Sequence, residues 1–169
     1  RQITTGTRNT IIGGLAGDAL TTGHYNVALG FGALSTEDDH GTNVAIGYSA
    51  LLLQNAGADA YNVAVGYNAG VSVSTGARNT LVGGLAGDAL TTGQRNVAIG
   101  YAALSSEDAN SFNVAIGDST LAQLNAGANG YNVAVGYSTG QAMTLGVQNT
   151  LVGALAGDAL TEGNNNIAC

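Results

Sequence analysis

The feature that most constrains this chain is an asparagine that returns at a nearly fixed spacing. Successive copies stand seventeen or nineteen positions apart along almost the whole chain. A period of this kind predicts stacked structural repeats, each in contact with its neighbours, rather than one globular core. The asparagines are Asn9, Asn26, Asn43, Asn62, Asn79, Asn96, Asn113, Asn132, Asn149 and Asn166.

A second, longer period spans four of these repeats. Residues 9–23 (NTIIGGLAGDALTTG) return almost unchanged as residues 79–93 and 149–163. Four short repeats were therefore copied together. We expect residues 1–169 to form one repeat segment of a longer fibre, with copies at 9–78 and 79–148 and a partial copy at 149–169.

Each short repeat has the pattern of one coil of a β-solenoid. In the first nine repeats, the third residue after the asparagine is aliphatic and the fourth is glycine. Short runs of β-branched residues that end at glycine are typical of strands leading into turns. Two short strands and two turns fit into a repeat of this length. The predicted fold is all-β, a parallel β-solenoid with coils stacked about 4.8 Å apart.

Alternation along the strand assigns its two faces. Val27 and Leu29 point to one side and Ala28 to the other. We place the aliphatic pair inside the coil, which leaves the alanine face outside. An apolar stripe along a thin rod predicts a partner, most simply further copies of the chain. The predicted oligomer face is Ala28, Ala45, Ala64, Ala98, Ala115 and Ala134, with Ile11, Leu81 and Leu151 in the same column.

Three recurring residue types have structural interpretations. The asparagines are expected to form a ladder of side-chain amide hydrogen bonds from coil to coil. The glycine after the strand allows a positive φ or the close approach of a neighbouring chain. The aromatic residue after it is expected to cover the turn, with sugar stacking as the alternative. These aromatics are Phe31, Tyr48, Tyr67, Tyr101 and Tyr137.

The charge of the chain argues against two classes of partner. The net charge is −7, and charged residues make up only 9% of the sequence. Binding to nucleic acid or to an anionic membrane surface requires clustered basic residues, so neither partner is expected. The sequence also has no apolar stretch of the ~18–20 residues that a membrane span requires.

We expect no enzyme, because no catalytic or cofactor-binding constellation is found. Residues 13–18 contain a Gly-Gly-x-x-Gly-Asp run, which lacks the short period of a calcium-binding β-roll. No glycine cluster precedes Lys-Ser or Lys-Thr, as a phosphate-binding loop would require. His24 and His40 do not recur in the next copy of the four repeats, where Gln94 and Asn110 stand instead.

Two matching acidic loops are the one irregular feature, at residues 35–40 and 105–110. Our main interpretation is a solvated loop that keeps a fibre of low charge soluble. The alternative is a site for a divalent cation or for a basic patch on a receptor. The residues of that alternative site are Glu37, Asp38, Glu107 and Asp108.

The strands of residues 26–30, 43–47 and 96–100 (NVALG, NVAIG and NVAIG) resemble the head repeats of YadA-like trimeric autotransporter adhesins. The Asn-Thr repeats at residues 9, 79 and 149 are similar to related repeats in phage tail-fibre shafts. The resemblance covers essentially the whole chain. It implies a left-handed parallel β-roll, three chains intertwined as a homotrimer, and a role in attachment to a surface.

The predicted function is therefore a structural or adhesive segment of a trimeric surface fibre or virion tail fibre. Such a fibre is extracellular, and its partners are further copies of the chain and a host receptor or glycan. One alternative is a subunit that assembles end to end into an extracellular solenoid filament. An ice-binding solenoid ranks last, because Thr10, Thr80 and Thr150 recur only once in every four repeats. A calcium-binding solenoid is also less expected, because the glycine–aspartate run at residues 13–18 lacks the required short period.

Overall fold

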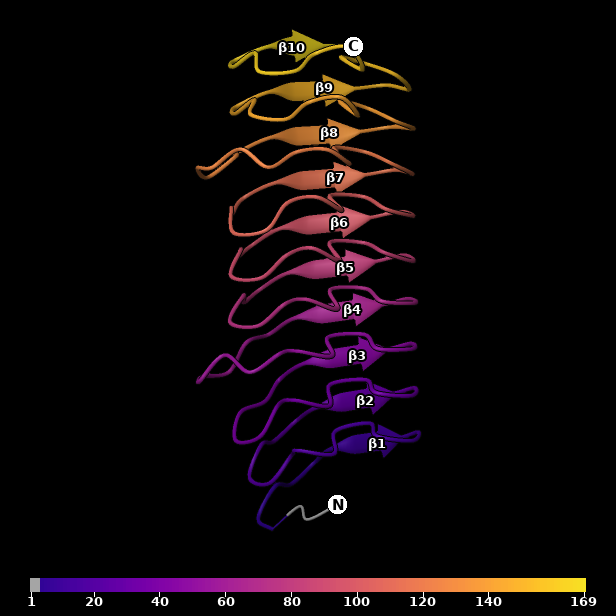
Figure 1. Cartoon of the computed structure of the whole chain (residues 1–169), viewed down its shortest axis with the longest axis vertical. Helices are drawn as coiled ribbons and strands as arrows, with labels where there is room; N and C mark the ends of the chain where they lie inside the picture. The colour runs from indigo at the N-terminus through magenta and orange to yellow at the C-terminus, as the bar shows by residue number, and fades with distance from the viewer. Residues whose placement is uncertain (1–3) are drawn as a thin grey trace.

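A computed structural model of the chain describes residues 4–169 as a rod of stacked coils (Figure 1). Ten strands in these residues form one parallel sheet in sequence order. No helix in the described part is long and apolar enough to cross a membrane. The strands are β1 Thr10–Ile12, β2 Val27–Leu29, β3 Val44–Ile46, β4 Val63–Val65, β5 Thr80–Val82, β6 Val97–Ile99, β7 Val114–Ile116, β8 Val133–Val135, β9 Thr150–Val152 and β10 Ile167–Ala168.

The predicted parallel β-solenoid is confirmed, and the register places equivalent residues above one another. Val27 of β2 pairs with Val44 of β3, and Ala28 pairs with Ala45. The same register continues across the two longer coils, where Val44 pairs with Val63. Each longer coil carries a loop that projects from the rod, between β3 and β4 and between β7 and β8 (Figure 1). The extra length is therefore accommodated outside the sheet.

The prediction of two strands per coil is wrong, because each coil has one strand of at most three residues. The opposite wall consists of turns that are hydrogen-bonded from coil to coil. The backbone N–H of Gly17 donates to the carbonyl of Ala33 at 2.9 Å, and that of Thr21 donates to the carbonyl of Asp38 at 2.8 Å. Residues with positive φ recur in this wall, including Leu34 at 52°. Left-handed residues prevent a continuous strand while preserving the stacking.

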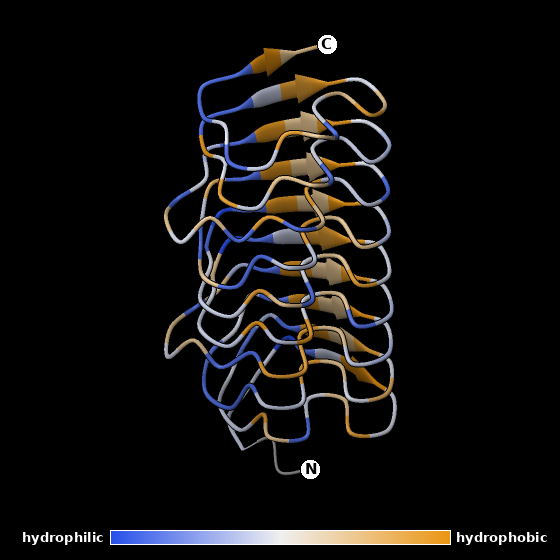
Figure 2. Cartoon of the chain, turned by 45° about the horizontal axis from the view of Figure 1, so that its top comes forward, coloured by the Kyte–Doolittle hydropathy of each residue, from blue (hydrophilic) through white to orange (hydrophobic). Residues whose placement is uncertain are grey.

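The prediction about the two strand faces is also wrong. The six alanines assigned to an outer oligomer face (Ala28, Ala45, Ala64, Ala98, Ala115 and Ala134) are all 0% exposed within the single chain. The aliphatic residues on either side of them are partly exposed, as Val44 and Ile46 are in β3. Figure 2 shows hydrophobic residues along the strands. The physical reason is the narrow interior, which leucines from the turn wall already fill. These leucines, such as Leu34 and Leu104, are themselves 0% exposed.

Leu81 and Leu151 share the alanine column and are likewise buried, not outward-facing. Where Leu81 replaces alanine, the turn wall has glycine. A Cβ on Gly70 would lie 2.6 Å from Leu81 Cδ1, and a Cβ on Gly87 would lie 2.8 Å from Leu81 Cδ2. Large and small residues thus complement each other across the interior. Because Gly70 belongs to the coil before Leu81, this complementarity crosses coil boundaries.

Candidate functional surfaces

The asparagine column forms a ladder inside the rod. Asn79 Oδ1 accepts the backbone N–H of Asn96 at 3.0 Å, and Asn79 Nδ2 donates to the carbonyl of Gly93 at 2.8 Å. Asn96 repeats this pattern with Asn113 and Asn110, both at 2.9 Å. Each side chain therefore joins two coils and closes one turn. In most coils the hydrogen bond to the next coil joins a backbone N–H to an asparagine Oδ1. The sequence analysis expected bonds between side-chain amides instead.

The glycine after each of strands β1 to β8 occupies a corner where a Cβ would overlap the backbone of the next coil. Gly100 has a φ of +135°, and a Cβ there would lie 2.3 Å from the carbonyl oxygen of Gly117. The backbones of successive coils therefore approach closely at this corner, which explains why glycine recurs there. The close approach is between coils of one chain.

An outer aliphatic face runs along the sheet, formed by the residues one and three positions after each of the first nine asparagines. Exposure of its aliphatic side chains reaches 59% at Ile12, 39% at Leu29 and 45% at Val152. Its members in β3 to β7 are partly exposed. Its members are Thr10, Ile12, Val27, Leu29, Val44, Ile46, Val63, Val65, Thr80, Val82, Val97, Ile99, Val114, Ile116, Val133, Val135, Thr150 and Val152.

The aromatic residues after the glycine form a short stack on one edge of the rod. Phe31 and Tyr48 stack with ring centroids 5.6 Å apart, and Tyr48 and Tyr67 stack at 5.4 Å. Both faces of Tyr48 are therefore covered by neighbouring rings. Phe31 in turn lies against Gly14, where a Cβ would be 3.2 Å from its ring. The covering role fits the geometry of these three rings. Tyr101 and Tyr137 are 57% and 60% exposed, and sugar stacking stays a prediction for them.

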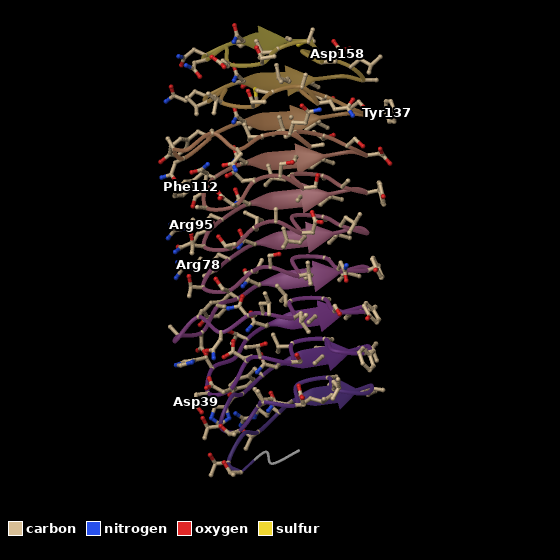
Figure 3. The ribbon with its side chains drawn as sticks, in the orientation of Figure 1. Asp39, Arg78, Arg95, Phe112, Tyr137 and Asp158 are labelled. Carbon is tan, nitrogen blue, oxygen red and sulfur yellow. The ribbon has the colours of Figure 1, made fainter. Side chains whose placement is uncertain are left out.

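A second exposed column, which the sequence analysis missed, lies just before the asparagines. Arg8 lies over Tyr25 at 5.1 Å from the ring centroid, and Arg95 lies over Phe112 at 5.4 Å. Phe112 stacks on Tyr131 at 4.9 Å. Arg95 and Phe112 lie on the side of the rod where the strands begin, whereas Tyr137 lies where they end (Figure 3). The recurrence of arginine or an aromatic residue one position before asparagine was the available signal.

The acidic loops differ from the predicted solvated loops, because Glu37 and Glu107 are buried. Both are 0% exposed. They stand eleven positions after an asparagine, in a core column that otherwise includes Leu20 and Leu90. In each loop the glutamate Oε1 accepts a backbone N–H at 3.2 Å, from His40 or Asn110, while Oε2 has no hydrogen-bond partner.

Burial changes the ionisation of both glutamates. Loss of hydration raises the pKa of Glu37 to about 7, although the hydrogen bond from the His40 backbone opposes the shift. Burial raises the pKa of Glu107 for the same reason. Asp38 is half-buried and Asp108 is exposed. The four residues of the alternative cation site therefore do not form one site: they lie in two loops, each with one buried glutamate.

Comparison with protein-family models, curated proteins and solved structures gives no match. Residues 4–169 also contain no pocket. The candidate functional features in the described residues are therefore surfaces of the rod, among them the outer aliphatic face.

Proposed function

We propose that this chain is a shaft segment of a homotrimeric attachment fibre, in which copies associate through the outer aliphatic face. The observation that carries the proposal is the strip of partly exposed aliphatic side chains along the outer side of the sheet. Burying such a strip against like strips removes apolar surface from water, at about 25 cal/mol per Å². The face thus replaces the alanine column as the proposed contact between chains.

The shape of the molecule supports a mechanical role. Ten strands stacked in order span nine steps of about 4.8 Å, so the rod is on the order of 43 Å long. Hydrogen bonds between successive coils on both walls make such a rod stiff. We infer that its task is reach, outside a cell or on a virion tail, and that a host receptor or glycan is bound by the assembled fibre. The resemblance of the NVAIG strands to adhesin and tail-fibre repeats is the basis for that inference.

Mass measurement by multi-angle light scattering tests the proposal. The segment is expected to have three times the chain mass, and the double variant Ile99→Glu/Ile116→Glu is expected to be monomeric. Both isoleucines belong to the outer aliphatic face, where charges would be buried without partners in the trimer. Leu53→Glu is the matched control, because Leu53 is 48% exposed but lies outside this face.

Three results would contradict the proposal. A stable monomer for the unmodified segment removes the need for partner chains. Trimers that persist in the double variant place the contact elsewhere on the rod. Polymers that grow with concentration favour the end-to-end filament instead.

A further inference from the structure

One loop of the rod brings three metal-ligating side chains together. Glu37, Asp38 and His40 each offer a ligand atom, and these atoms all lie within 4.8 Å of one another. His40 Nδ1 is 3.9 Å from Glu37 Oε1. The loop lies on the coil that follows β2, and Asp39 within it is marked in Figure 3.

Two ligand atoms in this loop are buried without hydrogen bonds. Glu37 is 0% exposed and its Oε2 has no hydrogen-bond partner. His40 Nδ1 is also buried without one. A buried carboxylate oxygen and a buried imidazole nitrogen are each costly to leave unpaired. A cation bound between them would compensate both groups at once.

The loop around the three residues is held by the preceding coil and by Asn26 of its own coil. The hydroxyls of Thr21 and Thr22 donate to Asp39 Oδ1 at 2.8 and 2.9 Å. The carbonyl of His40 accepts from Asn26 Nδ2 at 3.1 Å. Asp39 is thus already used as an anchor for the loop. These contacts hold the loop at Asp39 and His40, next to the ligand atoms.

We propose that Glu37, Asp38 and His40 bind one divalent transition-metal ion of the zinc type. One imidazole with two carboxylates suits Zn²⁺ better than Ca²⁺, which takes oxygen ligands only. Tetrahedral ligands about 2.1 Å from zinc lie about 3.4 Å apart. The separation of 3.9 Å between Glu37 Oε1 and His40 Nδ1 is close to that value, and a carboxylate oxygen of half-buried Asp38 lies within 4.8 Å of a ligand atom of each. Three protein ligands leave the fourth position for water.

The second copy of the loop provides an internal comparison. Glu107 and Asp108 match Glu37 and Asp38, but Asn110 stands where His40 would be. In the described residues, only the first loop forms a group of three possible ligands. The imidazole is therefore what distinguishes a metal site from a buried glutamate. This inference is independent of the proposed trimer.

Isothermal titration with Zn²⁺ tests the site, in a Cys169→Ser background because Cys169 is an exposed thiol. One Zn²⁺ per chain is expected. The variant His40→Asn carries the residue of the second loop and is expected to weaken binding at least tenfold. The control His24→Gln introduces the residue that the next copy has at the matching position, and it is expected to bind as before. Asn110→His is expected to raise the stoichiometry toward two.

Circular dichroism of each variant checks that the solenoid is retained, so a loss of binding can be assigned to the ligand. Absence of Zn²⁺ binding to the parent at millimolar concentration would overturn the proposal. Unchanged affinity in His40→Asn would do the same, as would equally tight binding of Ca²⁺. Loss of binding in His24→Gln would move the site to the other histidine.

Discussion

Substitution of one central asparagine measures what the ladder contributes to stability. Asn79 is 0% exposed, and its side chain forms hydrogen bonds with two backbone groups, the N–H of Asn96 and the carbonyl of Gly93. Asn79→Ala leaves both groups buried without a partner. Each unpaired buried group costs about 1–3 kcal/mol, so two cost about 2–6 kcal/mol. That is a large part of the roughly 5–15 kcal/mol that typically separates folded from unfolded domains.

Denaturant unfolding at fixed protein concentration gives the loss of unfolding free energy, and hydrogen exchange reports on the Asn96 amide. We expect this amide to lose its protection in Asn79→Ala. The control is Asn55→Ala, because the Asn55 side chain makes only a 3.5 Å bond to the Thr36 carbonyl. The control should change the unfolding free energy by less than about 0.5 kcal/mol. A loss below about 1 kcal/mol for Asn79→Ala, with Asn96 still protected, would refute the reasoning.

Two further predictions concern the corner glycine and the buried glutamate. Gly100→Ala places a Cβ 2.3 Å from the Gly117 carbonyl oxygen and should lower the melting temperature sharply. In the control Gly57→Ala the new Cβ has no atom within 4 Å, and the positive φ alone should cost about 1 kcal/mol of unfolding free energy. Equal melting temperatures for the two variants would contradict the close packing of coils. Because burial raises the pKa of Glu107, its stabilising contribution is complete below its ordinary pKa of 4.5 and is lost as the pH rises through the folded value. Glu107→Gln should therefore flatten the fall in unfolding free energy with rising pH, measured with a chelator present, and an unchanged slope would show that Glu107 is solvated.

The period of the sequence was sufficient to predict the solenoid, because asparagine and glycine each meet a requirement that recurs once per coil. Asn79 satisfies groups in two coils, and Gly100 allows a backbone contact that any side chain would block. Both requirements are local to a position in the repeat. Spacing alone therefore revealed them.

The direction of the strand faces could not be predicted from alternation. Val27, Ala28 and Leu29 are all apolar, so burial of either face is consistent with the pattern. The choice depends on the opposite wall, where Leu34 fills the space that a larger residue at position 28 would need. The prediction that the Glu37 loop is solvated was wrong for a related reason. The charge of Glu37 suggested solvent, but this residue stands eleven positions after Asn26, which is a core position.

The complementarity around Leu81 limits how a fibre of this kind can change length. Leu81 extends into the space left by Gly70 in one coil and Gly87 in the next. Removing the single coil of residues 62–78, which holds Gly70, would bring the coil of Leu51 against Leu81 and remove the space that Leu81 occupies. The coils that begin at Asn26 and Asn43 are alike in the core, with an alanine in the strand and a leucine in the turn wall, so a coil of this kind could be added or lost without breaking the complementarity. A whole cassette of four coils, such as residues 9–78, also keeps the order of large and small residues, and it lengthens the rod by about 19 Å, four coils at about 4.8 Å each.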